Sequence, residues 1–291
     1  MSEPRAPERA APLTASLAPL RDILASAGIT ADKRFGQHFL FDLNICRKIV
    51  RLAEIAEGET VLEVGPGPGG LTRALLEAGA RVAVVEKDSR FIPLLEELAV
   101  NAGGRLTVIE GDALDVDELA VLRGIGAGSS GHVVSNLPYN IGSPLLVKWL
   151  TGDFQPLSMT LMFQKEVALR IVASAGQADY GRLAVLAQTI CEARSVMDLP
   201  ARAFTPPPKV TSAVVRLTPL EHRPPRVLVE ALQYVARSAF GQRRKMLRSS
   251  LKFLGGEQLC IAAGIDPDAR AETISVAGFR ALAEAWMARR D

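Results

Sequence analysis

The segment TVLEVGPGPGGLT, residues 60–72, decides the fold. Its first five residues predict a β-strand, and the residues after the glycines continue as a helix. Gly65, Gly67 and Gly70 between them have the spacing GxGxxG. Such a turn lets a ligand approach the backbone, with the first amides of the helix facing it. A tight turn that binds nothing would contain the same glycines, so the loop alone is a weak signal.

Strands and helices alternate outward from this segment. The helix LTRALLEAG follows the loop, and Asp88 is placed to cap the helix SRFIPLLEELAVN. An amphipathic helix, LNICRKIVRLAEIA, precedes the first strand. Further strands are predicted at residues 81–86, 105–113, 131–136 and 158–164. The alternation predicts an α/β fold with a parallel, doubly wound sheet.

The second half of the chain predicts a late strand and then helices alone. We expect a helix at residues 181–193 and a strand at residues 212–217, pairing antiparallel at the sheet edge. TPLEHRPPR, with three prolines, predicts a linker, and the remaining segments have a helical period only. We therefore expect a disordered tail at residues 1–20, an α/β domain at 21–217 and a small helical domain at 218–291.

Composition is typical of a globular cytoplasmic protein. The chain has 291 residues, of which 48% are hydrophobic, enough for one large domain or two ordinary ones. No apolar run is long enough to cross a bilayer, and MSEPRAPERAAPLTA lacks the apolar segment of a secretory signal. Cys46, Cys191 and Cys260 lie far apart, so we expect neither a disulfide framework nor a metal site.

Positive charge is concentrated in one stretch, although the net charge is only +2. Between Arg237 and Lys252 there are six basic residues and no acidic one. Such an excess predicts an anionic partner such as nucleic acid. The alternative is a solvated helix face.

Two acidic residues follow successive strands and indicate a nucleoside site. Glu86 ends the strand after the glycine loop, where a carboxylate can accept hydrogen bonds from both ribose hydroxyls. Up to this point NAD and S-adenosylmethionine fit equally well. Asp112 ends the third strand and can accept from an adenine amine, which favours S-adenosylmethionine; its alternative role is a helix N-cap. Pro66 and Pro68 also fit poorly with a pyrophosphate cradle that needs free backbone amides.

The loop NLPY, residues 136–139, indicates methyl transfer to a base amine. The lone pair of an adenine amine is delocalised into the ring, so the amine is a poor nucleophile. The Asn136 side-chain oxygen and the Leu137 carbonyl can accept its two hydrogens and free the lone pair. Pro138 stiffens the loop and Tyr139 can stack on the base. Catalysis would then come mainly from positioning and electrostatics.

On these motifs the chain resembles the rRNA adenine N6,N6-dimethyltransferases of the KsgA/RsmA type. The resemblance runs from about Lys33 to Leu251. It is carried by FGQHFL, VLEVGPGPGGLT, VVEKD, EGDAL, SNLPYNIGSPLL, MFQKEVALR, AFTPPPKVTSAVVRL and AFGQRRKMLRSSL. It implies a class I (Rossmann-like) methyltransferase sheet with a small all-helical C-terminal domain.

The resemblance also implies roles for further residues. His38 and Leu40 would contact the methionine part of the cofactor, although many relatives have Asn in place of His38. Phe204 would be a second aromatic that sandwiches the target base with Tyr139; core packing is the alternative for both rings. The basic residues of AFGQRRKMLRSSL would bind RNA phosphates, so binding would depend on salt. These residues are Arg243, Arg244, Lys245 and Arg248.

The activity that the resemblance implies is transfer of four methyl groups from S-adenosylmethionine to two adjacent adenosines. They lie in the hairpin loop near the 3′ end of small-subunit (16S) rRNA, within a 30S assembly intermediate, and S-adenosylhomocysteine is the other product. A loop is a suitable target because its bases can be splayed out at little cost. We expect a cytoplasmic monomer that binds neither metal nor membrane.

Three alternatives remain open at this stage. A large-subunit rRNA adenine methyltransferase of the macrolide-resistance type would share most of the motifs. A non-catalytic rRNA-binding assembly factor would not need an intact NLPY loop and both acidic residues. An NAD-dependent dehydrogenase would explain the glycine loop but not NLPY.

Overall fold

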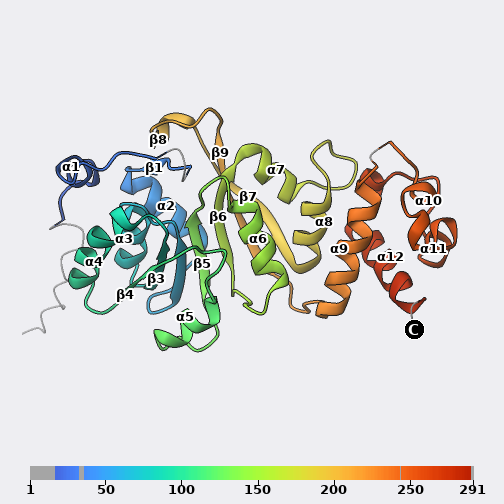
Figure 1. Ribbon diagram of the computed structural model, residues 1–291, viewed down its shortest axis with the longest axis horizontal. Coiled ribbons are helices and arrows are strands. Elements are labelled where there is room, and N and C mark those ends of the chain that lie inside the picture. The colour runs from blue at the N-terminus through green and yellow to red at the C-terminus, as the bar shows by residue number, and fades with distance from the viewer. Residues whose placement is uncertain (1–16, 33–35, 243, 290–291) are drawn as a thin grey trace, which may run out of the picture.

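The computed structural model describes residues 17–32, 36–242 and 244–289. An α/β part and a helical part lie next to each other along the long axis of the molecule (Figure 1). Most of the predicted N-terminal tail, residues 1–16, lies outside the described residues. Leu20, which we placed in that tail, is instead the buried first residue of helix α1 (Leu20–Ser26).

Seven strands form the main sheet, in the order β4-β3-β2-β5-β6-β9-β7. Their bounds are β2 Thr60–Val64, β3 Arg81–Glu86, β4 Leu106–Glu110, β5 His132–Asn136, β6 Met159–Gln164, β7 Cys191–Leu199 and β9 Ser212–Pro219. The first five strands in the sheet order are parallel, and β9 is antiparallel to both β6 and β7. The chain winds outward from β2 to β4 and then returns to β5, so the order reverses between β2 and β5. In open α/β sheets such a switch point is where ligands bind.

Helices cover both faces of the sheet because successive side chains of a strand alternate between the faces. In β3, Val82 and Val84 join one apolar core while Ala83 and Val85 join the other. The first core includes helices α2 Leu43–Ala53, α3 Gly70–Glu77 and α4 Ile92–Asn101. The second includes α5 Glu118–Gly124, α6 Gly142–Thr151, α7 Lys165–Val172 and α8 Arg182–Ile190. The predicted doubly wound arrangement is therefore confirmed.

The prediction for the far edge of the sheet was wrong in two respects. The helix expected at residues 181–193 ends at Ile190, and the chain continues directly into β7, which forms the edge. The strand expected at the edge, β9, lies between β6 and β7. Burial along β7 does not alternate regularly, and its register shifts between Ser195 and Met197, so no period of two was visible in the sequence.

A short two-stranded sheet lies above the carboxyl ends of the parallel strands. Strand β1 (Phe39–Leu40) pairs antiparallel with β8 (Phe204–Thr205), and Leu40 lies opposite Phe204. We call residues 36–40 the strap. It brings the N-terminal FGQHFL motif next to the FTPPP motif, far apart in the sequence; Phe35 lies outside the described residues.

The C-terminal part is helical, as predicted. It contains α9 Arg226–Phe240, α10 Leu247–Ser250, α11 Gly256–Ala262 and α12 Val276–Ala288 around its own apolar core. Tyr180 and Val185, from the α7–α8 region, also join this core, so it extends past the predicted boundary at residue 217. The segment GQRRKMLRSSLKFL is less helical than expected, because Leu247 and Arg248 donate their amides to Ala269 and Pro267 across the domain.

Candidate active site

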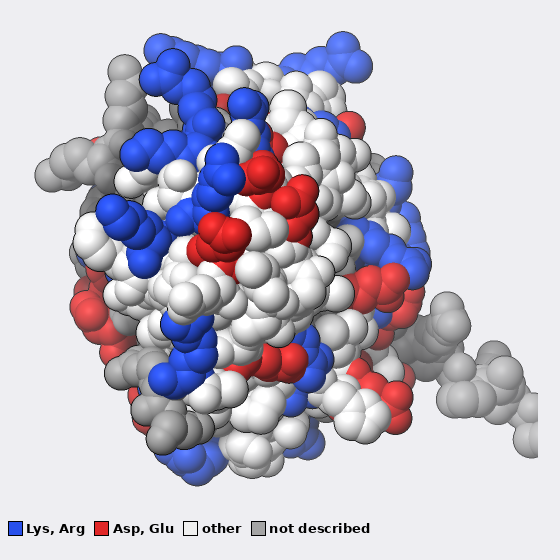
Figure 2. Space-filling model, turned by 90° about the vertical axis from the view of Figure 1, so that its right-hand side faces the viewer, with Lys and Arg blue, Asp and Glu red and all other residues white. Residues whose placement is uncertain are grey.

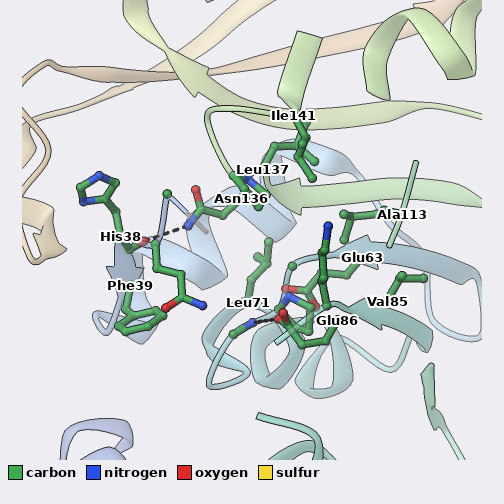
Figure 3. A pocket seen from close by; sticks show the side chains of 18 of the residues that line it. His38, Phe39, Glu63, Leu71, Val85, Glu86, Ala113, Asn136, Leu137 and Ile141 are labelled. Atoms are coloured by element: carbon green, nitrogen blue, oxygen red, sulfur yellow. Dashed lines mark hydrogen bonds between the residues drawn. The ribbon is translucent and has the colours of Figure 1, made fainter. Parts of the chain in front are cut away.

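A cavity lies where the parallel strands end, at the switch point between β2 and β5. The strap, the glycine loop and the segments at the ends of β3, β4 and β5 line it, and these segments include Glu86, Asp112 and Asn136. Figure 3 shows the strap, Glu86 and Asn136 around this space. The lining falls in residues 36–40, 63–68, 70–71, 85–87, 111–113 and 136–141. The FGQHFL motif, the glycine loop, the two acidic residues and the NLPY loop, each identified by a different signal in the sequence, therefore meet at one cavity.

The glycine loop is shaped by positive backbone φ angles. Gly65 and Gly67 have φ values of 66° and 54°, which L side chains rarely adopt. A Cβ on Gly65 would lie 3.2 Å from the ring of Pro138, so the glycine loop and the NLPY loop are in tight contact. Gly67 turns its amide away from the loop and donates it to Glu86 Oε2 at 2.9 Å. The loop is thus tied both to the catalytic loop and to the predicted ribose acid.

Glu86 is held in a fixed orientation by backbone donors. Its Oε1 accepts the Asp88 amide at 2.8 Å and its Oε2 accepts the Gly67 amide. The side chain is only 5% exposed, and burial is the main reason that its pKa is raised. Each oxygen keeps a second lone pair, as the predicted contact with two ribose hydroxyls requires.

Asp112 is held differently, close to the surface. Its Oδ2 accepts from Lys87 Nζ at 2.6 Å and its Oδ1 accepts the Leu114 amide at 3.0 Å. The Lys87 hydrogen bond is the main reason that the pKa of Asp112 is lowered. Asp112 is not a helix N-cap, because the next helix, α5, begins at Glu118 and is capped by Asp117. Asp112 instead stabilises the turn after β4. It also lines the cavity, so this turn contact and ligand contact are compatible.

The amide of Asn136 is oriented by the strap. Its Nδ2 donates to the His38 carbonyl at 3.4 Å (dashed in Figure 3). Among the described residues, no donor is found for Asn136 Oδ1, so this oxygen is available as an acceptor. The neighbouring Leu137 side chain is buried and anchors the loop.

Tyr139 is fixed at both ends. Its hydroxyl shares a hydrogen bond with Ser212 Oγ at 2.6 Å, and its ring lies 5.4 Å from the His38 ring, centroid to centroid. Burial raises the pKa of the phenol. The hydroxyl therefore stays protonated at neutral pH, and Tyr139 presents a neutral aromatic ring at the cavity.

Glu63 is a cavity residue that the sequence analysis did not single out. It is 1% exposed, accepts a hydrogen bond from Thr72 Oγ1 at 2.7 Å, and burial raises its pKa to about 8. A neutral carboxyl next to the glycine loop can ionise when a cationic ligand binds beside it. A signal was present: a lone carboxylate inside the apolar run TVLEV is costly unless it has a function.

One predicted site residue, Phe204, does not occupy the place expected of it. The Phe204 ring is buried, 3% exposed, in the core next to β1 and does not line the cavity, so in this conformation it cannot sandwich a base. Leu40, its partner across the short sheet, is also mostly buried, although it does line the cavity. The pair instead holds the strap down.

The predicted RNA-binding residues lie in the C-terminal part, away from the cavity. Arg244 and Lys245 are exposed, Arg248 is paired with Asp268 at 2.8 Å, and Arg243 lies outside the described residues. Figure 2, which faces this end of the molecule, shows Lys and Arg side chains gathered in patches with acidic side chains among them. The basic surface is therefore partly neutralised.

The described ranges lack metal-ligand clusters and membrane-spanning helices. They contain no group of three or more His, Cys, Asp or Glu side chains that could hold a metal ion. Nor do they contain a helix long and apolar enough to span a membrane. The three cysteines are buried and unpaired.

The cavity residues fit S-adenosylmethionine. A buried carboxylate with spare lone pairs suits a ribose diol, and Asp112 suits an adenine amine. Glu63 suits a cationic group beside the glycine loop. The strap closes tightly over that loop, since a Cβ on Gly70 would lie 2.7 Å from the Leu40 carbonyl. A side chain at Gly70 would therefore clash with the strap.

Comparison with known proteins agrees with this chemistry. The ribosomal RNA adenine dimethylase family matches residues 28–287. The chain is 64% identical over 276 residues to the ribosomal RNA small subunit methyltransferase A of Phenylobacterium zucineum, covering 95% of both chains. It is 67% identical over 261 residues to that of Caulobacter vibrioides, covering 90% of this chain and 99% of the relative.

Solved structures give the same result. A dimethyladenosine transferase from Plasmodium falciparum aligns with a TM-score of 0.68 at 27% identity, over 84% of this chain and 96% of the other. The 23S rRNA methyltransferase ErmE aligns with a TM-score of 0.65 at 26% identity, over 86% and 99%. The chain belongs to the ribosomal RNA adenine dimethylase family.

Proposed function

We propose that this protein methylates N6 of two adjacent adenosines in the 3′-terminal hairpin loop of small-subunit rRNA, with S-adenosylmethionine as methyl donor. The single observation that carries the proposal is the Asn136 amide. The His38 carbonyl holds its Nδ2 and leaves Oδ1 as an acceptor at the cavity, beside Tyr139. The relatives named for the small ribosomal subunit support the choice of rRNA.

The cofactor is held by groups that recognise its parts separately. Glu86 accepts from the ribose hydroxyls and Asp112 from the adenine amine. Glu63 lies on the strand that leads into the glycine loop, where it stabilises positive charge once ionised. When bound, S-adenosylmethionine supplies a methyl group on a positively charged sulfur.

The residues of the NLPY loop prepare the nucleophile. Asn136 Oδ1 and the Leu137 carbonyl accept the two hydrogens of the adenine amine, which localises the nitrogen lone pair. Pro138, packed on Gly65, limits the freedom of the loop, and Tyr139 offers a ring for stacking. The proton leaves after methyl transfer, so no strong base is needed. The loop acts by positioning.

Residues outside the cavity serve the larger substrate. Arg244 and Lys245, with Arg243 and Arg248, contact phosphates of the rRNA. Phe204 contributes indirectly, by packing beneath the strap. We also propose that the enzyme acts as a cytoplasmic monomer on a 30S assembly intermediate.

The test is tritiated methyl transfer to small subunits that lack the modification, followed by nucleoside analysis. We expect N6,N6-dimethyladenosine in the 3′-terminal hairpin loop, and none with Asn136→Ala. Incorporation at another position or in another nucleoside would contradict the proposal.

A second candidate is methylation of large-subunit rRNA. The observation in its favour is that ErmE aligns almost as well as the dimethyladenosine transferase, with TM-scores of 0.65 and 0.68. The same assay on large-subunit rRNA separates the two candidates. We expect transfer to the small subunit only.

A further inference from the structure

The strap is an extended segment whose two sides face different parts of the active site. Side chains alternate along extended backbone. Gln37 Nε2 donates to Asp88 Oδ2 at 2.7 Å, and a Cβ on Gly67 would lie 3.4 Å from the ring of Phe39. The Asp88 amide in turn donates to Glu86, the proposed ribose acid. Gln37 and Phe39 therefore face the cofactor side.

His38, between them, faces the other way. In Figure 3 the side chains of His38 and Phe39 leave the strap in opposite directions. The His38 ring lies 5.4 Å from the Tyr139 ring with an interplanar angle of 33°. Its Nδ1 donates to the Pro206 carbonyl at 2.8 Å, in the segment that follows β8. The imidazole thus contacts the NLPY loop and the FTPPP segment, not the cofactor side.

The spacing of the two rings decides what His38 can do there. A base sandwiched between two rings needs a contact distance of about 3.5 Å on each side, hence roughly 7 Å between the rings. The centroids are 5.4 Å apart, so no base fits between them. The imidazole instead supports one side of the Tyr139 ring and leaves the rest of that ring for the substrate.

The same residue also orients the catalytic amide. The His38 carbonyl accepts Asn136 Nδ2, which leaves Oδ1 for the substrate amine. The contacts of the ring with Pro206 and Tyr139 restrain the backbone of the same residue, from which this carbonyl projects. Resting on the proposed function, we propose that His38 is a positioning residue of the target-base pocket: its ring holds Tyr139 and its backbone holds Asn136.

The test compares His38 with its neighbour Gln37, which lies on the same strap but faces the cofactor side. Binding of tritiated S-adenosylmethionine without RNA gives the cofactor Kd. Methyl transfer to unmethylated small subunits at saturating cofactor gives kcat and KM for the particle. For His38→Ala we expect a cofactor Kd within about twofold of wild type and a kcat/KM about tenfold lower. For Gln37→Ala we expect the reverse, a cofactor Kd raised about tenfold and a smaller change in kcat at saturation.

Two conservative variants separate the contacts of the imidazole. His38→Phe keeps a ring beside Tyr139 but cannot donate to Pro206. His38→Asn can place an amide nitrogen where Nδ1 lies but has no ring. The Pro206 hydrogen bond is exposed, so water can replace it. We expect His38→Phe to restore kcat/KM to within about threefold of wild type and His38→Asn to stay near the alanine value.

The outcomes that would overturn the inference are distinct from failure of the proposed function. If His38→Ala weakens cofactor binding as much as Gln37→Ala does, His38 is a cofactor ligand. If His38→Ala changes neither quantity, or if Asn restores activity and Phe does not, the ring does not position Tyr139. If the wild-type enzyme does not methylate small subunits, the proposed function fails, and the same four variants are compared on large-subunit rRNA.

Discussion

The cavity at the strand ends and the basic end of the C-terminal domain differ in how their polar groups are held. In the cavity, Glu63 and Glu86 are almost fully buried, and each accepts hydrogen bonds from fixed donors. At the C-terminal end, Arg244 and Lys245 are exposed, and water and salt screen their charges. The first region can position reacting atoms, whereas the second can only attract and hold an anionic surface. Substitutions in the cavity should therefore have large effects on activity that do not depend on salt concentration. Substitutions at the C-terminal end should have small effects that do.

The strongest test of this contrast is Asn136→Ala. The variant removes an acceptor for the substrate amine, and we expect methyl transfer to fall by about 10³-fold, the upper range for loss of one preorganised polar group. The Kd for S-adenosylmethionine should stay within about threefold, because Glu86 and Asp112 remain. Equal loss of binding and catalysis, measured by equilibrium dialysis and tritiated transfer, would show that Asn136 serves the cofactor.

The effect of burial on the Glu63 carboxyl can be tested through the pH dependence of stability. Its pKa is about 8 in the folded protein and about 4.3 in an unfolded chain. Between these values the folded protein keeps a proton that the unfolded chain has lost. Glu63 therefore lowers stability as pH rises from about 4.3 to about 8. Glu63→Gln should remove this loss, and the variant should gain on the order of 3 kcal/mol relative to wild type between pH 5 and pH 8.

The measurement is denaturant unfolding of the cofactor-free protein over that pH range. Glu110→Gln, an exposed residue of β4, is the matched control and should track wild type. A constant difference between Glu63→Gln and wild type at every pH would mean that Glu63 is ionised in the folded state.

Glu86 and Asp112 allow a buried carboxylate to be compared with a partly exposed one in the same cavity. Glu86→Ala would leave the ribose hydroxyls of the bound cofactor without their acceptor, so cofactor binding should weaken by about 1–3 kcal/mol. Asp112 is less buried and paired with Lys87, so Asp112→Ala should cost less, about 1 kcal/mol. Calorimetric titration with S-adenosylmethionine measures the loss of binding free energy in each variant. A larger loss of binding free energy for Asp112→Ala than for Glu86→Ala would show that Asp112 contributes more to cofactor binding.

The smallest effect is expected at the C-terminal end. Replacing Arg244 and Lys245 by Gln should weaken binding to pre-subunits a few-fold. The slope of log K against log salt should become less steep by about 1.5, because two phosphates would no longer be neutralised by the protein. Arg226→Gln with Arg280→Gln is the control, because both of these arginines are already paired with acidic residues of their own helix. Equal slopes for the two double variants would show that Arg244 and Lys245 do not touch RNA.

Much of the fold could be predicted because its signals are local. The GxGxxG spacing, Asp88 as a cap and the alternation of strands and helices depend on neighbouring residues, and the structure confirms them. Strand β7 could not be predicted, since an edge strand with a register shift has no regular pattern of burial. Family membership was also readable from the motifs and is confirmed by the family match.

In the candidate site, too, the features that depend on local sequence were predicted and those that depend on distant segments were not. The residues that follow the strands were found because parallel strands bring their ends to one edge whatever their exact packing. The buried position of Phe204 was not predicted, because it depends on pairing between β1 and β8, which lie more than 160 residues apart. Glu63 was missed although a lone carboxylate inside the apolar run TVLEV was a signal, because its contact with Thr72 and its place at the cavity depend on the packing of α3 against β2.

By itself, the sequence determined the chemistry: a glycine turn, two acidic residues and an amide-aromatic loop in the order that a methyl transfer to a base amine needs. Tertiary structure alone decided how the strap lies, and so which of its side chains contact Asp88, the glycine loop and Tyr139. The physical reason is that chain order places strand ends at a common edge, whereas the orientation of a side chain depends on the partners that distant segments supply.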